Sequence, residues 1–174
     1  MPKAPPVGEL EFLHTTQNHR DYRSRLLRLG QTVAEAEIRE FANFVGLRWY
    51  KLATFHLREA TRSLGNRSRR SAYSRAYYAA YNASKAVRYI ASGFVSLKAD
   101  DHQKAPDLPG DFPQAASWGP KLMTLYEQRL RADYDFWRGT PAKFTLTPKA
   151  CVGMARAFVR ECRGYLRDRH GLKP

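Results

Sequence analysis

Apolar residues recur at spacings of three and four along most of this chain, which is the period of helices that bury one face. The first such region covers about 21–46 and predicts a helical arm, with Gly46 expected to end its last helix. Another helix is expected over about 47–64. Residues 1–20 contain several prolines and few periodic apolar positions, so we expect them to form a tail.

The clearest helix is the segment of about 71–92, which is rich in alanine and tyrosine and lacks the alternation of a strand. Prolines exclude regular structure from most of 98–119, so a long loop is expected there. One more helix is expected over about 120–137. The last helix begins with Thr147 as its N-cap and Pro148 at its first position. The chain is therefore predicted to be all-α, a helical bundle over about 47–170.

Two faces of the predicted helix at 71–92 indicate packing. One face carries small side chains, which allow another helix to approach closely, either within the bundle or by self-association. These are Ala72, Ala76, Ala79, Ala83 and Ala86. The neighbouring face carries Tyr73, Tyr77 and Tyr81, whose rings we expect to be buried with their hydroxyls hydrogen-bonded.

The third face of this helix mixes cations with aromatic rings. It comprises Arg75, Tyr78, Asn82, Lys85 and Tyr89. Cations between rings suit phosphates and unstacked bases, whereas a merely solvated face is the other interpretation. We therefore take Arg75, Tyr78 and Lys85 as candidate nucleic-acid contacts.

Charge strengthens the nucleic-acid interpretation. The chain has 30 Lys and Arg against 16 Asp and Glu, a net charge of +14. A net charge of about 2–8 is enough to keep a small domain soluble. Polyanions are the expected partners, with nucleic acid first and an acidic protein next. The last helix adds four arginines on one stripe, which favours an anion or an acidic partner there. They are Arg156, Arg160, Arg163 and Arg167.

The cysteines, the apolar stretches and the histidines restrict the cellular compartment and the class of protein. Cys151 and Cys162 would lie about 16 Å apart along one helix, too far for a disulfide, so we expect reduced thiols in a cytoplasmic protein. No apolar stretch is long enough to span a membrane, and the first residues lack a signal-peptide pattern. The five histidines are scattered and no paired CxxC occurs, so neither a metal nor a cofactor is expected.

Three segments together carry a family resemblance: LRWYKLATFHLREA, SAYSRAYYAAYNASKAV and LYEQRLRADYDFW. With SRAYYA at Ser74–Ala79, a histidine in the following loop (His102) and an RxxADY motif at Arg129–Tyr134, the chain resembles the HEPN superfamily (higher eukaryotes and prokaryotes nucleotide-binding domain). More narrowly, it resembles the small stand-alone prokaryotic branch. The match covers roughly 47–166, which leaves the arm at 21–46 outside it.

The resemblance implies an up-and-down bundle of four to five helices, commonly a homodimer with its key helices at the two-fold cleft. Many relatives are metal-independent endoribonucleases, often toxins or defence effectors paired with a small nucleotidyltransferase. In them a base activates the ribose 2′-OH, and an arginine stabilises charge on the transition state. The family motif is an arginine followed four to six residues later by a histidine, and here Tyr134 stands five residues after Arg129.

The candidate catalytic residues are Arg129, Asp133, Tyr134 and His102. Arg129 with Asp133, and Arg131 with Asp135, also have the i,i+4 spacing of simple helix ion pairs. In the alternative interpretation Arg129, Asp133 and Tyr134 line a cleft that binds a phosphate or nucleotide, with Arg131 as a further nucleic-acid contact.

Two functions are therefore predicted. The first is binding of RNA or nucleotides in a prokaryotic toxin–antitoxin or defence system, with endoribonuclease activity through a degenerate motif. The alternative is a non-catalytic interaction module whose basic face docks an acidic partner such as a nucleotidyltransferase.

Overall fold

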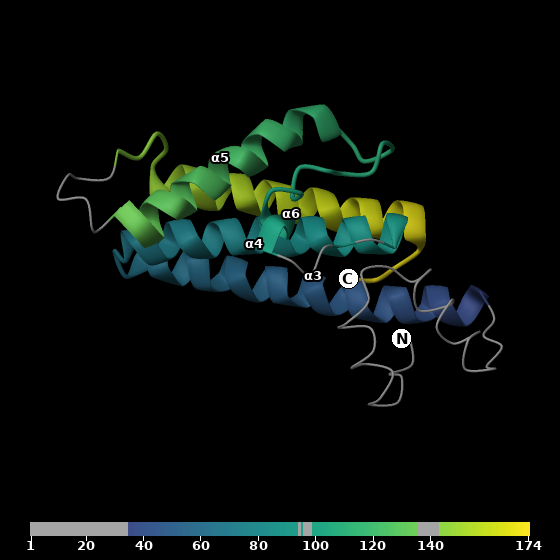
Figure 1. The fold of residues 1–174 in the computed structure, drawn as a ribbon. Helices are drawn as coiled ribbons and strands as arrows, with labels where there is room; N and C mark the ends of the chain where they lie inside the picture. The colour runs from purple at the N-terminus through teal and green to yellow at the C-terminus, as the bar shows by residue number, and fades with distance from the viewer. Residues whose placement is uncertain (1–34, 94, 96–98, 136–142) are drawn as a thin grey trace.

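The computed structural model describes residues 35–93, 95, 99–135 and 143–174, and these form a bundle of α-helices without a strand (Figure 1). The elements are α3 (Glu35–Gly65), α4 (Arg69–Ser92), the 3-10 turn η1 (Ala99–His102), α5 (Ala115–Tyr134) and α6 (Pro148–His170). The predicted all-α fold is confirmed. The tail expected at 1–20 and the first part of the helical arm lie outside the described residues.

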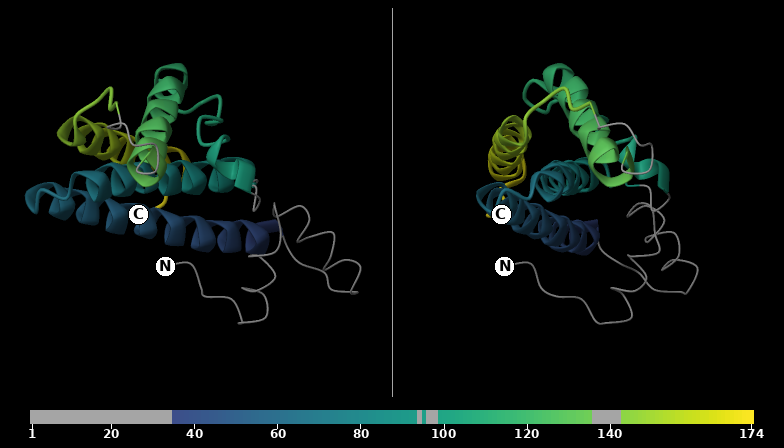
Figure 2. Two further views of the ribbon diagram at one scale, coloured as in Figure 1. Left: turned by 60° about the vertical axis from the view of Figure 1, so that its left-hand side comes forward. Right: turned by 90° about the vertical axis from the view of Figure 1, so that its left-hand side faces the viewer.

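Helix α4 is the centre of the bundle, because each of the other three described helices packs more extensively against α4 than against any other helix. A short turn joins α3 to α4, so these two helices run antiparallel and side by side (Figures 1 and 2). Helix α6 packs against both of them, and α5 lies across α4 (Figure 2). Helix α5 makes far fewer contacts with α6 than with α4.

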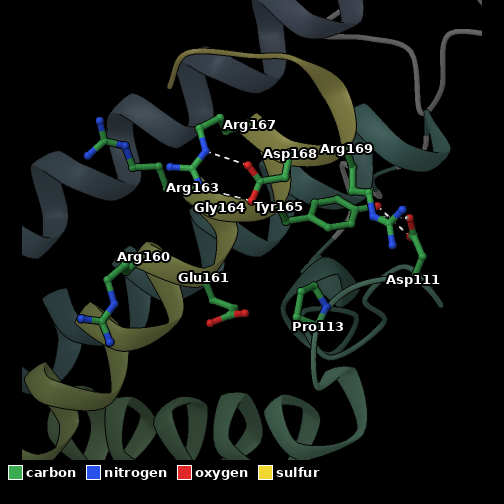
Figure 3. Close-up of a pocket in the computed structure, with 10 residues that line it drawn as sticks. All are labelled: Asp111, Pro113, Arg160, Glu161, Arg163, Gly164, Tyr165, Arg167, Asp168 and Arg169. Carbon is green, nitrogen blue, oxygen red and sulfur yellow. Dashed lines mark hydrogen bonds and ion pairs between the residues drawn. The ribbon is translucent and has the colours of Figure 1, made fainter.

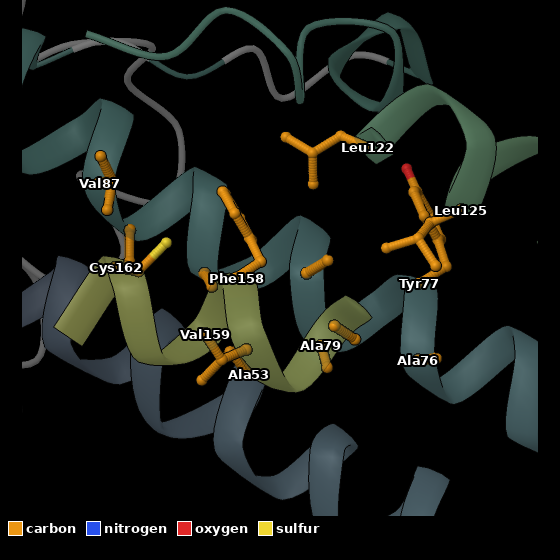
Figure 4. Packing of buried hydrophobic residues seen from close by; sticks show 14 of the residues in the cluster. Ala53, Ala76, Tyr77, Ala79, Val87, Leu122, Leu125, Phe158, Val159 and Cys162 are labelled. Carbon is orange, nitrogen blue, oxygen red and sulfur yellow. The ribbon is translucent and has the colours of Figure 1, made fainter. Parts of the chain in front are cut away.

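The alanine face of α4 explains this central position. Its five alanines are fully buried, so the backbones of neighbouring helices can approach α4 closely. Figure 4 shows Ala76 and Ala79 of α4 in one core with Ala53 of α3 and with Phe158 and Val159 of α6. The packing expectation is confirmed within a single chain.

On the tyrosine face of α4, Tyr73 and Tyr77 are buried and Tyr81 is partly buried, and all three hydroxyls are hydrogen-bonded as expected. Tyr73 donates to the carbonyl oxygen of Leu146 at 2.6 Å. The hydroxyls of Tyr77 and Tyr81 bond instead to residues of η1. This face therefore attaches the connections before and after α5 to the centre of the bundle.

The expected helix end at Gly46 is wrong, because α3 runs without interruption from Glu35 to Gly65. The boundary expected between the arm and the bundle therefore falls inside α3. Gly46 is buried against α4, and a Cβ atom at this position would overlap the side chain of Ile90. The glycine permits a close approach between the two helices rather than ending one.

Replacing Gly46 with alanine should therefore destabilise the protein, although alanine is the better helix former. We expect overpacking against Ile90 to lower the free energy of unfolding by about 1–3 kcal/mol. Gly153 provides the matched control, since it lies exposed within α6 with nothing near its missing Cβ. Gly153→Ala should raise stability by about 0.5–1 kcal/mol. Urea unfolding of both variants tests this, and a stabilised Gly46→Ala variant would contradict the packing argument.

The remaining expectations about the helices are largely confirmed. The hydroxyl of Thr147 accepts a hydrogen bond from the backbone N–H of Ala150 at 3.1 Å and caps α6. Helix α5 begins at Ala115, earlier than expected, and Pro120 lies inside it. Cys151 and Cys162 are buried and not bonded to each other. No helix among the described residues is both long and apolar enough to cross a membrane.

Candidate functional site

Arg129 of α5 is the centre of a polar cluster against α4. Its Nη2 donates a hydrogen bond to the Tyr78 hydroxyl at 2.9 Å and lies 3.4 Å from the Tyr134 hydroxyl. Its Nε lies 2.8 Å from a carboxylate oxygen of Asp133. The predicted i,i+4 ion pair is therefore present, and it is part of a larger arrangement.

The guanidinium of Arg129 also lies against two aromatic rings. Its central carbon is 5.5 Å from the ring centre of Tyr78 and 5.2 Å from that of Tyr134, within the range of cation–π attraction. Contacts on several sides hold the cation in one orientation. Tyr134 is 56% exposed, so this ring is accessible from solvent.

His102, from η1, lies beside this cluster among tyrosine rings. Its Nδ1 is 2.8 Å from the Tyr77 hydroxyl, and its ring centre is 4.4 Å from that of Tyr81. The ring of Tyr126, from α5, is stacked with the His102 ring, with 6.2 Å between the two ring centres. Burial, and then the positive charge of Arg129, lower the pKa of His102 below its usual value, so the imidazole is neutral at neutral pH.

A buried ion pair holds η1 against α4. Both carboxylate oxygens of Asp101 accept hydrogen bonds from Arg88, at 3.1 and 3.3 Å, and one also accepts from the Tyr81 hydroxyl at 2.6 Å. Both charged side chains are buried. Arg88 is in turn bonded to Ser84, whose hydroxyl donates to the carbonyl oxygen of Ala105. These bonds fix the segment that carries His102.

Sequence reasoning missed Arg88 and Asp101. The sequence does contain a signal for Arg88. It follows Tyr77 and Tyr81 at helical spacing, so it is a cation on the face of the helix that was predicted to be buried. A buried cation requires a carboxylate partner. Asp101, which directly precedes His102, was a candidate for that partner.

Lys85 lies at the far end of the candidate surface and is partly buried. Its Nζ is 3.9 Å from Asp101 and 4.7 Å from the ring centre of Trp49. Burial lowers the pKa of Lys85 below its ordinary value, while Asp101 acts in the opposite direction. Asn82 and Tyr89 of the same face are buried, so the third face of α4 is exposed only over its first half.

Arg75 is exposed and lies next to the cluster. Its Nη1 is 3.3 Å from Nδ1 of His56, and the His56 ring centre is 5.6 Å from that of Tyr78. Burial and then the Arg75 charge lower the pKa of His56. His56 was not predicted to belong to this site, because only the packing of α3 against α4 brings it there.

Arg131 is directed away from the cluster. It lies two residues after Arg129, on another side of α5, where it pairs with Glu127 at 3.7 Å. The structure thus brings together Arg129, Asp133, Tyr134, Tyr78 and Arg75, with His102 adjacent, and leaves Arg131 apart. No group of three or more metal-ligating side chains occurs in the described part of the chain.

Three arginines of the α6 stripe, Arg160, Arg163 and Arg167, line a separate pocket of about 620 Å³ (Figure 3), whereas Arg156 bonds to Thr61 of α3. Carboxylates offset most of its positive charge. Arg167 pairs with Asp168 at 2.7 Å, and Arg169 lies 4.0 Å from Asp111. Glu161 lines the same pocket (Figure 3). We therefore do not assign to this pocket the anion or acidic partner that the arginine stripe led us to expect.

No family model, curated protein or solved structure matches the chain. The chemistry of the candidate site is therefore inferred from its own side chains.

Proposed function

We propose that this protein binds RNA or nucleotides at the surface formed by Arg129, Tyr78, Tyr134 and Arg75. The observation that carries the proposal is the guanidinium of Arg129, held between two tyrosine rings beside a further exposed arginine. A fixed guanidinium suits a phosphate, and an exposed ring such as that of Tyr134 suits a base. The net charge of +14 would attract such a ligand.

A further part of the proposal is metal-independent RNA cleavage at the same surface. His102 is neutral, so it is available to accept a proton from a ribose 2′-OH, whose oxygen attacks the adjacent phosphorus while Arg129 stabilises charge on the phosphate. The bond from phosphorus to the 5′-oxygen of the next nucleotide breaks, which leaves a 2′,3′-cyclic phosphate, and the protonated imidazole returns its proton to that leaving oxygen. This role requires the tautomer in which Nδ1–H of His102 donates to the Tyr77 oxygen, which leaves Nε2 free to accept the proton. The resemblance to the HEPN superfamily supports this activity, a homodimeric cytoplasmic protein and a role in a toxin–antitoxin or defence system.

Arg129→Ala should weaken RNA binding by at least about tenfold, because it removes the fixed cation from the proposed surface. Arg131→Ala is the matched control, since it removes the same charge two residues away and should change affinity much less. Filter binding of a labelled single-stranded RNA at low salt measures both. Binding should weaken as salt rises. Thermal unfolding shows whether each variant is folded.

Absence of RNA affinity at low salt would refute the proposal, and equal losses in the two variants would remove Arg129 from the site. The same preparations, incubated with total RNA, separate binding from cleavage. Cleavage that is lost in Arg129→Ala supports the ribonuclease, whereas RNA left intact by the wild-type protein limits the function to binding.

A further inference from the structure

A second surface lies away from Arg129, between the first half of α3 and the chain that follows α6. Figure 1 shows the segment after α6 running beside α3, and the two enclose an open groove of about 920 Å³. None of the residues of the proposed RNA surface lines this groove. An inference about it is therefore independent of the RNA proposal.

The charged side chains that line the groove are all cationic. Four of its lining residues are cations: Arg48, Lys51, Arg163 and Lys173. No carboxylate side chain is among the residues that line it. None of the four forms an ion pair with a carboxylate of the described residues. Arg163 is shared with the neighbouring pocket of α6, but that pocket is also lined by carboxylates and the groove is not. Unpaired like charges close together favour a negatively charged occupant.

The floor of the groove is apolar, with Leu47 and Leu172 among its residues. Its aromatic rings are not open for stacking with bases. Tyr50 is buried, and its hydroxyl donates to the carbonyl oxygen of Val159 at 3.1 Å. The guanidinium of Arg48 covers the ring of Phe44, with its central carbon 5.0 Å from the ring centre. Proteins that bind single-stranded nucleic acid commonly stack its bases on free aromatic faces, which this groove does not offer, so these contacts favour a protein ligand.

Exposed apolar side chains continue from the groove along α3. Leu52 is 41% exposed and Phe55 is 45% exposed, and they follow Arg48 at i+4 and i+7, on the same side of the helix. Together with Tyr134 they are the exposed large hydrophobic residues of the described chain. Apolar side chains bordered by cations match an amphipathic segment whose other residues are acidic.

We propose that this groove docks an acidic segment of a partner protein, with aliphatic side chains on the apolar floor and carboxylates at the four cations. Such a ligand satisfies both properties of the surface. A nucleic-acid backbone would satisfy only the charge.

A displayed library of random short peptides, selected against the full chain, tests this proposal. Selected peptides should be rich in Asp, Glu and aliphatic residues. They should bind a variant carrying Lys51→Glu and Lys173→Glu at least about tenfold more weakly than wild type. The matched control carries Lys149→Glu and Arg160→Glu, which make the same change in net charge at exposed residues outside the groove. The control should bind like wild type.

Four outcomes would overturn the proposal. The first is equal weakening in both double variants, which indicates general attraction to a basic protein. The second is unchanged binding when the aliphatic residues of a selected peptide become serine. The third is the absence of any peptide that depends on the groove. The fourth is a loss of RNA binding only in the groove variant, which makes the groove a nucleic-acid surface.

Discussion

Asp101→Ala should lower the free energy of unfolding by about 3–5 kcal/mol, because it leaves a buried Arg88 without its partner. The substitution removes two hydrogen bonds from Arg88 and one from the Tyr81 hydroxyl. Lys85, which lies 3.9 Å from the same carboxylate, also loses its counter-charge. Chemical denaturation with the linear-extrapolation analysis gives the difference directly.

Asp107→Ala is the matched control for this prediction. Asp107 is an exposed aspartate in the same connection between α4 and α5, and its removal should change stability by no more than about 0.5 kcal/mol. Replacing the pair together, with Arg88→Met and Asp101→Leu, should recover much of the loss, since no buried charge is left unpaired. An Asp101→Ala variant as stable as the control would show that the ion pair does not hold η1.

Stability should also depend on pH through Asp101. Burial acts to raise the pKa of this carboxyl, but the hydrogen bonds and charge of Arg88 outweigh burial and hold it below its ordinary value of 3.8. A group whose pKa is lower in the folded state contributes stability above its unfolded pKa and loses it as pH falls through its folded pKa. The free energy of unfolding should therefore fall below about pH 4, by up to about 1.4 kcal/mol per pH unit from this single group.

Asp101→Asn isolates this contribution, because asparagine does not titrate in the acid range. Unfolding measured at a series of acid pH values should give a shallower dependence for the variant than for wild type. All other carboxylates are common to both proteins, so the difference between the two curves belongs to Asp101. Parallel curves would mean that its pKa is the same in the folded and unfolded states.

Much of the fold could be predicted from the sequence, because its signals are local. Alanine spacing determines how closely the other helices approach α4, and the threonine and proline at the start of α6 fix that helix end. Gly46 was misjudged for a physical reason. Glycine also permits close packing inside a helix, and only the position of Ile90 on α4 distinguishes the two roles.

The candidate site could be predicted only in part. The RxxADY motif led to Arg129, Asp133 and Tyr134, which are neighbours on one helix. Tyr78, which accepts the hydrogen bond from Arg129, comes from α4. His56 of α3 reaches Tyr78 only because α3 packs against α4. Such contacts depend on how the helices are rotated about their axes, and spacing within one helix does not reveal that rotation.

Helix α5 is attached to the bundle mainly through α4, and its contacts with α6 are few. A helix held on one side can detach in a partial unfolding event while the remaining helices stay packed. Because Arg129, Asp133 and Tyr134 all belong to α5, this event would dismantle the candidate site without global denaturation. A macromolecule that binds across α4 and α5 would suppress the detachment, and one that binds α5 only when it is detached would favour it. The fraction of molecules with an intact site is thus set by the docking equilibrium of one helix.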